Sequence, residues 1–282
     1  MKTVNTPPDA VELRQRAFHA FGISDALLKA DAVQTLWRES RCESPPMVLD
    51  TTAAFPALQQ PGKPDRPACV NPQDVPRRSP FTPGGHAALI HSIAHIEFNA
   101  INLALDAIWR FAGMPAGYYH DWLRVAQEEA KHFMLLRTHL QDVGHDYGDF
   151  VAHDGLWTMC IATQHDITAR MALVPRTLEA RGLDATPIIQ AKLRKVATPQ
   201  ALAAVAILDV ILQEEVGHVA IGNHWYRWLC ERDGRDPVRF YAEAADRHNA
   251  PTLKPPFNLP ARRQAGFTDA EINTLPTGQP SP

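Results

Sequence analysis

The 282-residue chain has little of what marks several common classes of protein. Its four cysteines are widely spaced and form no CxxC motif, which argues against a zinc knuckle or a disulfide framework: Cys42, Cys69, Cys160 and Cys230. We therefore expect reduced thiols. The net charge of −3 gives no basic excess of the kind that binds nucleic acid or anionic membranes. A small soluble substrate or partner is the expectation that remains.

Long apolar runs and alternating patterns are also missing. We find no stretch of about 18 apolar residues and no apolar signal-peptide run at the amino terminus. The sequence therefore predicts a cytoplasmic protein with no membrane partner. No segment of credible length alternates apolar and polar residues with a period of two, so the predicted fold class is all-α.

Proline, by contrast, is concentrated in one part of the chain. Ten of the 24 prolines lie from Pro45 to Pro83, which excludes helix interiors there and predicts an extended segment. A disordered linker is one interpretation. A wrapping arm is the one we prefer, since apolar residues could anchor it: Val48, Leu49, Phe55, Leu58 and Val70. Before this arm, two short helices are expected to open at Thr6, followed by Pro7, and at Ser24.

After Thr82 the sequence pattern becomes helical. Capping residues, prolines and glycines predict long helices from Thr82 to Gly113, Pro115 to Gly144, Asp154 to Gly182, and Thr198 to the region before Gly234. Shorter helices are expected over residues 187–196 and 236–248, and at Thr268, which fits a capping box with Glu271. These features divide the chain into short helices and the wrapping arm (1–81), a helical bundle (82–233), and a helix with an extended tail (234–282).

The most informative pattern is the order Glu, ExxH, Glu, ExxH. It comprises Glu97, Glu129 with His132, Glu179, and Glu215 with His218. Residues three apart on an α-helix lie about 60° apart around its axis, so each ExxH presents both side chains on one face. The lone glutamate precedes its ExxH by 32 residues in the first half and by 36 in the second. Each separation fits one helical hairpin, and both halves would then meet at the middle of a four-helix bundle.

Four carboxylates inside an apolar bundle are costly unless cations compensate them. Two divalent cations would balance four glutamates, and a mixed carboxylate and imidazole set favours iron, with manganese as the alternative. Two alternatives stay open. Glu128 and Glu214 directly precede the ExxH acids, so the helix register could be misread. Glu179 lies near an expected helix end and could instead cap it or pair with Arg176 or Arg181.

Other residues have weaker claims to a role in the site. His91 and His95 are well away from the metal-binding face of their helix and are expected to contact the amino-terminal arm or to line an entrance. His165 lies about 21 Å along a helix from Glu179 and cannot share its metal. Pro175 forces a kink in its helix, which either accompanies a functional site or only shapes the bundle.

The segments HSIAHIE, VAQEEAKHF, RTLEARGLD and EEVGHVAIGNHW resemble those of a bacterial branch of the ferritin-like superfamily, catalogued as domain of unknown function 455. The similarity extends from around Arg66 to PFNLPARRQAGF, about three quarters of the chain. It implies a ferritin-like four-helix bundle with a dinuclear iron site, and each of the six residues it implies as ligands is present. It implies no substrate, because relatives include ferroxidases, rubrerythrin-like peroxidases and hydroxylases, one of which acts on a modified tRNA base.

Three functions therefore stay open. The first, which we prefer, is an O₂-dependent di-iron oxidoreductase of oxygenase or hydroxylase type. Its small-molecule substrate would bind in a pocket enclosed by the segments before and after the bundle. The second is a ferroxidase or iron-handling protein, and the third is a non-enzymatic bundle whose two metals have only a structural role. A homodimer is one assembly that the sequence leaves open. A tRNA partner is disfavoured, because basic residues near the third long helix are typical of a solvated face: Arg170, Arg176, Arg181, Lys192, Arg194 and Lys195.

Overall fold

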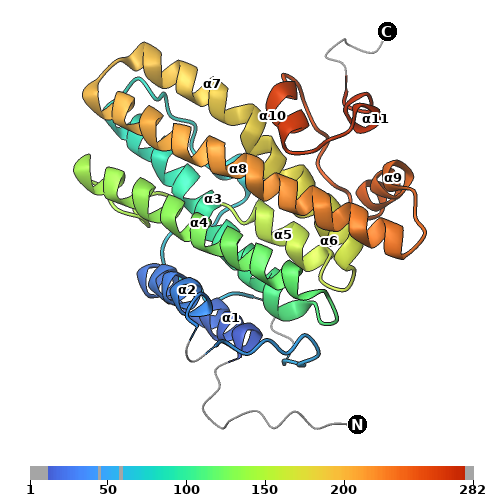
Figure 1. The fold of residues 1–282 in the computed structure, drawn as a ribbon. Coiled ribbons are helices and arrows are strands. Elements are labelled where there is room, and N and C mark those ends of the chain that lie inside the picture. Colours follow the sequence, from blue (N-terminus) through green and yellow to red (C-terminus); the bar gives the residue numbers. More distant parts are fainter. Residues whose placement is uncertain (1–11, 44–45, 57–59, 277–282) are drawn as a thin grey trace. The chain divides into compact units, whose positions relative to one another are not determined.

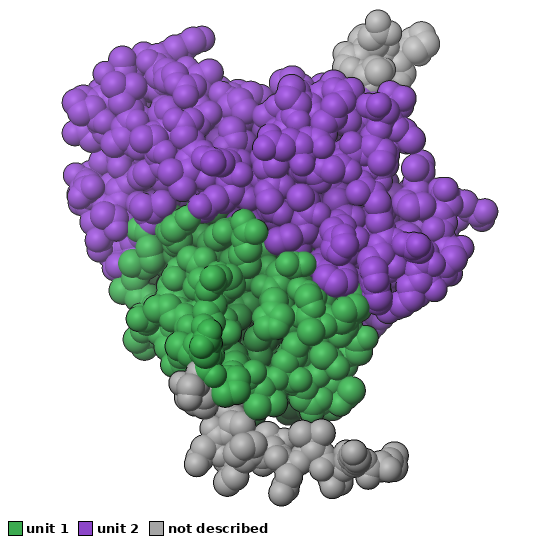
Figure 2. All heavy atoms as spheres, viewed as in Figure 1, with its two compact units in different colours: residues 1–66, 96–134 green, residues 67–95, 135–282 purple. Residues whose placement is uncertain are grey.

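A computed structural model of the chain describes residues 12–43, 46–56 and 60–276. Within these ranges every regular element is helical, and the extended pairing consists of two isolated bridges, Glu12 with Val48 and Cys69 with Ala152. The predicted all-α class is confirmed. The chain divides into two compact units, which Figure 2 distinguishes by colour. Unit 1 comprises residues 1–66 and 96–134, and unit 2 comprises residues 67–95 and 135–282.

Figure 1 shows the helices in chain order. They are α1 (Leu13–Gly22), α2 (Ala26–Ser40), the 3₁₀ turn η1 (Pro72–Asp74), α3 (Pro83–Arg110), α4 (Ala116–Asp142), α5 (Gly155–Ala162), α6 (Ile167–Leu173), the π-helical η2 (Val174–Glu179), α7 (Ala180–Val196), α8 (Pro199–Arg232), α9 (Pro237–Arg247), α10 (Leu259–Gln264) and α11 (Asp269–Ile272). The helices α3 and α4 contribute to both units. The boundaries predicted at 81/82 and 233/234 divide the chain by its sequence pattern, whereas the two units are divided by contacts between residues. Those boundaries and the four-helix bundle stay predictions.

In unit 1, the segment after α2 lies along α1. The backbone N–H of Leu13 donates to the carbonyl of Val48 at 2.9 Å, and that of Gly62 donates to the carbonyl of Phe21 at 2.9 Å. The rings of Phe18 and Phe55 stack with their centroids 5.4 Å apart. The described part of the segment thus has the contacts expected of an arm. The predicted cap at Thr6 with Pro7, and the predicted anchor Leu58, lie outside the described residues.

One buried arginine joins α1, the arm and the end of α3 within unit 1. Arg14 is only 1% exposed, and its guanidinium donates to the carbonyls of Ile108 at 3.1 Å and Trp109 at 2.7 Å. These carbonyls belong to the last turn of α3, where no intrahelical donor is available. The same side chain donates to the carbonyls of Asp50 and Ala53 in the arm. Four backbone acceptors therefore compensate the buried charge.

The boundaries of the longest helices follow the predicted signals. Gly113 and Gly144, after α3 and α4, have φ angles of +77° and +82°, which glycine adopts without strain. The hydroxyl of Thr198 caps α8, and Thr268 forms the predicted capping box with Glu271. The start of α2 differs by one residue from the prediction at Ser24, because the carboxylate of Asp25 accepts the first N–H groups.

The single helix predicted from Asp154 to Gly182 is wrong. It is divided into α5, α6 and η2, and α7 continues through Gly182 and Pro187. A proline inside a helix removes the N–H that would bond the carbonyl four residues earlier, here that of Leu183. The side-chain amide of Asn258 donates to this carbonyl at 3.1 Å. A contact with the carboxy-terminal part of the chain thus replaces the bond that Pro187 removes.

The deformation predicted at Pro175 is a π-helical turn, η2. The hydroxyl of Thr177 donates to the carbonyl of Ala172 at 2.8 Å, which supplies a donor to a carbonyl at the end of α6, just before this irregular turn. On α8, a Cβ atom added at Gly222 would lie 2.6 Å from the Cβ atom of Pro175. The glycine therefore lets the backbone of α8 approach η2 closely.

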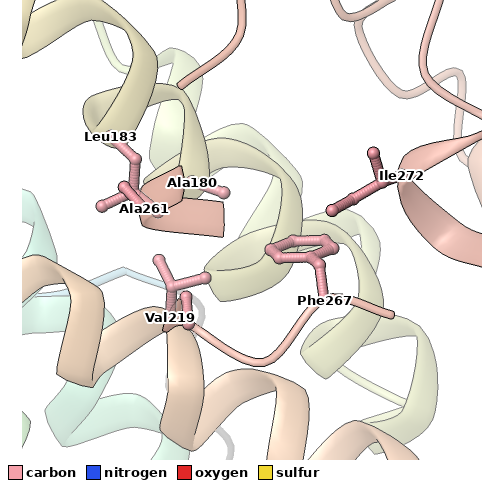
Figure 3. Close-up of a cluster of buried hydrophobic side chains, with 7 residues drawn as sticks. Ala180, Leu183, Val219, Ala261, Phe267 and Ile272 are labelled. Carbon is pink, nitrogen blue, oxygen red and sulfur yellow. The ribbon is translucent and has the colours of Figure 1, made fainter. Parts of the chain in front are cut away.

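The carboxy-terminal part of unit 2 packs against α7 and α8. Its apolar side chains form a buried cluster with residues of these helices, and Figure 3 shows the side chains directed toward one another. The cluster comprises Ala180, Leu183, Val219, Ala261, Ala265, Phe267 and Ile272. Burial of this apolar surface holds α10 and α11 in place against α7 and α8.

Among the described residues, α3 alone is long and apolar enough to cross a membrane by length and composition. This qualifies the expectation that the chain has no such stretch. However, 78% of the most apolar window of α3 is buried inside the protein, as is typical of a core helix in a soluble protein. The cytoplasmic location stays a prediction.

Candidate metal centre

Three of the six predicted ligands lie together in unit 1. Glu97 on α3 and the pair Glu129 and His132 on α4 present ligand atoms within 4.8 Å of one another. The Nδ1 atom of His132 lies 3.2 Å from Oε2 of Glu97 and 3.5 Å from Oε2 of Glu129. Two carboxylates from different helices thus converge on one imidazole.

The apolar stripe predicted on α4 explains why these side chains face inward. Its other members, each fully buried, are Tyr118, Trp122, Val125 and Leu136. Glu129 and His132 are also fully buried, and Glu97 is 5% exposed. Glu128 instead forms an ion pair with Arg124 one turn earlier, at 3.0 Å. The helix register therefore places the second acid of the Glu128–Glu129 couple in the interior, as predicted.

Burial and charge control the protonation of this group. Burial raises the pKa of Glu97 to about 8, the negative charge of Glu129 adds to the shift, and His132 opposes it. Burial alone would lower the pKa of His132, but its hydrogen bonds with Glu129 and Glu97 and their charges together raise that pKa well above its usual value. Protons held by Glu97 and by His132 thus reduce the negative charge of this buried group. A metal cation would provide the same compensation while releasing the protons.

The second ExxH pair lies in unit 2. On α8, the Nδ1 atom of His218 is 3.4 Å from Oε1 of Glu215, and both residues are buried on the predicted inward stripe. Glu179 is buried at the end of η2, which packs against α8. Arg176, one of the two alternative partners considered for Glu179, forms its ion pair with Glu271 at 2.8 Å. Unit 2 therefore contains two carboxylates and one imidazole of the predicted set.

The π-helical turn changes how the sequence positions Glu179. One extra residue in a helical turn rotates the residues that follow by about 100° relative to a regular α-helix. A prediction from regular spacing therefore could not assign the face of Glu179, which lies at the end of this turn.

The weaker candidates have other contacts. The backbone N–H of Gly148 donates to Nε2 of His91 at 2.9 Å, and burial lowers the pKa of His91 to about 4. His95 contacts the hydroxyl of Tyr147. His165 is exposed in the turn between α5 and α6. His91 and His95 were expected to contact the amino-terminal arm or to line an entrance. Both contact the loop after α4, and His95 also lies near Cys69 in the proline-rich segment.

The sequence patterns did not predict a second group of side chains that could hold a metal. Cys69, His95 and Asp154, all in unit 2, present ligand atoms within 4.8 Å of one another. They are distant in sequence and have no characteristic spacing, so no sequence pattern joins them. The four cysteines are free thiols, as expected.

The carboxy-terminal part of the chain lines a cavity of about 540 Å³ in unit 2. Arg176 of η2, Tyr241 of α9 and Arg262 of α10 contribute to its wall. Arg176 is 4% exposed and lies against the rings of Tyr226, Tyr241 and Phe267. Because Arg176 and Arg170 are both buried, two of the six basic residues considered for tRNA binding do not contribute to a basic surface.

Comparison with known proteins identifies the family. Residues 22–273 match the family model described as "Protein of unknown function (DUF455)", and this range contains all six predicted ligands. An uncharacterized protein of Haemophilus influenzae is 51% identical over 233 residues, which cover 80% of this chain and 77% of that protein. No solved structure matches the chain. The chain therefore belongs to the DUF455 family of proteins of unknown function.

Proposed function

We propose that this protein is a ferritin-like di-iron carboxylate protein that acts as an O₂-dependent oxidoreductase on a small molecule. The observation that carries the proposal is the buried convergence of Glu97, Glu129 and His132 in unit 1. Carboxylates and imidazole in a water-poor interior are the ligands that iron and manganese take in helical bundles.

We infer that Glu179, Glu215 and His218 of unit 2 complete a dinuclear centre with these three residues. The two halves have the same composition, namely two carboxylates and one imidazole. Their total charge when ionised is balanced by two divalent cations.

The residues of the chain have distinct roles in this proposal. The six side chains would hold two iron ions, with manganese as the alternative metal, and iron bound there would supply electrons for O₂ reduction. The buried stripe of α4 keeps water from the ligands on its side of the centre. The cavity of about 540 Å³ in unit 2 has the size of a small-molecule site and is lined by arginine and aromatic side chains, which supports a substrate with an anionic or planar group.

Iron loading tests the metal centre directly. The protein, stripped of metal and titrated anaerobically with Fe(II), should bind two ions per chain. Exposure to O₂ should then change the absorption spectrum. Glu129→Gln removes one buried ligand and should weaken iron binding about 100-fold or more, because loss of an outer-shell partner alone costs 10–100-fold. Glu128→Gln is the matched control and should bind as the wild type does.

The titration also separates the alternative functions. Without an organic substrate, the proposed oxidoreductase should oxidise about two Fe(II) ions per chain and stop, whereas a ferroxidase would continue with excess Fe(II). Binding of fewer than two ions, or O₂ exposure without any spectral change, would refute the proposal. Sizing chromatography that shows a large closed oligomer would instead favour iron storage.

A further inference from the structure

The group formed by Cys69, His95 and Asp154 lies entirely within unit 2 and comes from three separate segments. Cys69 is in the proline-rich segment, His95 is on α3, and Asp154 directly precedes α5. One ligand atom from each lies within 4.8 Å of the other two. A thiol, an imidazole and a carboxylate together can bind one divalent cation.

Backbone pairing fixes the position of the thiol relative to the carboxylate. The N–H of Val70 donates to the carbonyl of Ala152 at 2.9 Å, and the N–H of Ala152 donates to the carbonyl of Ala68 at 3.0 Å. This parallel bridge holds Cys69 beside the residue that lies two positions before Asp154. The arrangement therefore does not depend on flexible side chains alone.

The carboxylate of Asp154 is not used as a helix cap. Asp154 occupies the N-cap position of α5, yet its side chain makes no capping hydrogen bond. Its Oδ1 atom lies 3.9 Å from Nε2 of His95. An N-cap aspartate usually accepts from the first backbone N–H groups, so this orientation toward an imidazole indicates a different role.

The other ring nitrogen of His95 is also engaged. Its Nδ1 atom lies 2.9 Å from the hydroxyl of Tyr147, whose ring stacks on that of His91 with centroids 5.4 Å apart. With the proton on Nδ1, the imidazole donates to the phenol oxygen, and Nε2 is then the nitrogen that lies 3.9 Å from Oδ1 of Asp154. Metal-binding histidines are commonly oriented in this way by a partner of the second nitrogen.

The group is separate from the proposed dinuclear centre. His95 precedes Glu97 by two residues, which places the two side chains about 160° apart around α3. It also differs in ligand chemistry, because it contains a thiol and none of the six carboxylate-centre residues.

We propose that Sγ of Cys69, Nε2 of His95 and Oδ1 of Asp154 bind one zinc ion, with a fourth position open to water. A thiolate in the set favours zinc over the iron or manganese of a carboxylate site. Zinc bonds of about 2.0–2.1 Å to nitrogen and oxygen in tetrahedral geometry need these two atoms ~3.3 Å apart. Nε2 of His95 and Oδ1 of Asp154 are 3.9 Å apart, so a small side-chain movement would bring them to this separation. Cys69 is exposed and Asp154 is partly exposed, so the site is open to solvent.

Cobalt(II), a spectroscopic substitute for zinc, provides the first test. One equivalent added to the metal-free full-length protein should give a thiolate-to-cobalt charge-transfer band, which zinc should abolish by competition. Cobalt in the carboxylate centre has no thiolate ligand and gives no such band. Cys69→Ser should eliminate the band, and Asp154→Asn should weaken cobalt binding at least about 10-fold. Cys42→Ser, which removes the other exposed cysteine, should leave the band unchanged.

Thiol reactivity provides the second test. In the metal-free protein both exposed thiols, Cys42 and Cys69, should react quickly with a disulfide reagent. One equivalent of zinc should slow Cys69 about 10-fold or more without slowing Cys42. A charge-transfer band that survives Cys69→Ser, or zinc that protects neither thiol, would overturn the proposal. Iron loading in Cys69→Ser should remain at two ions per chain, so failure of one site is distinguishable from failure of the other.

Discussion

At the scale of single residues, the interior of unit 1 contains a lysine whose charge is costly to bury. Lys29 has no exposed surface, and its ammonium donates to the carbonyls of Phe21 at 3.1 Å and Gly62 at 2.7 Å and to the side-chain oxygen of Asn102. Burial lowers the pKa of Lys29 to about 7, and the positive charge of Lys63 adds to the shift. The three acceptors oppose it, because they match the three donors of the ammonium.

This lysine should make the stability of the protein depend on pH. Between pH 7 and about 10.4 the unfolded chain holds the Lys29 proton and the folded protein does not, so the free energy of unfolding should rise with pH. The slope is at most about 1.4 kcal/mol per pH unit. Below pH 7 Lys29 is protonated in both states, so it contributes no pH dependence there.

Urea unfolding at several pH values checks this prediction. Lys29→Met should remove the rise, whereas Lys254→Met, which replaces an exposed lysine, should retain it. An equal pH dependence in wild type and Lys29→Met would contradict the assignment.

The ExxH glutamates show how far sequence reasoning reaches at this scale. The apolar stripe of α4 identified Glu129, and not Glu128, as the buried acid, because helical periodicity alone decides which of two neighbours faces inward. The same reasoning could not place Glu179, since the π-helical turn before it breaks that periodicity.

At the scale of secondary structure elements, α7 depends on a contact from outside the helix. Asn258 donates to the carbonyl that Pro187 leaves without its intrahelical partner, and it also caps α10 by accepting from the N–H of Ala261 at 3.3 Å. Asn258→Ala should therefore cost the cap, about 1 kcal/mol, and in addition the penalty of a buried unsatisfied carbonyl, about 1–3 kcal/mol.

A double-mutant cycle isolates the second contribution. Pro187→Ala restores an N–H for the carbonyl of Leu183, so Asn258→Ala should then cost only the cap. The expected coupling between the two substitutions in urea unfolding is therefore about 1–3 kcal/mol. Additive costs would show that Asn258 acts only as a cap.

The approach of α8 to η2 gives a further test at this scale. Gly222→Ala would place a Cβ atom 2.6 Å from Pro175 and should destabilise the protein by about 1–3 kcal/mol. Gly182→Ala is the matched control, because nothing lies within 4 Å of a Cβ atom at this helical position. That substitution should be neutral or stabilising by up to about 1 kcal/mol. Thermal unfolding of both variants measures the difference, and equal effects would contradict the close approach.

At the scale of the whole molecule, removal of metal should lower stability without unfolding the protein. Protons on Glu97 and His132 reduce the negative charge of the buried group when no metal is bound, so we expect unit 1 to stay folded without the cation. At a metal concentration of 1,000 times the dissociation constant, binding contributes about 4 kcal/mol, equivalent to a thermal shift on the order of 10 °C.

Circular dichroism before and after chelation checks this expectation. Retained helical signal at 25 °C with a lower unfolding temperature is the expected result. Loss of the helical signal on chelation would favour the alternative in which the metals are a structural staple.

The sequence by itself determined the all-α class, the ends of α3, α4 and α8, and the inward faces that contain the two ExxH pairs. These features depend on residues within a few turns of one another, so local periodicity and capping chemistry specify them. Only the tertiary structure decided that α7 continues through Pro187, that Glu179 follows a π-helical turn, and that Cys69, His95 and Asp154 meet. Each of these depends on contacts between segments far apart in the chain, or on irregular backbone, for which no sequence spacing gives a signal.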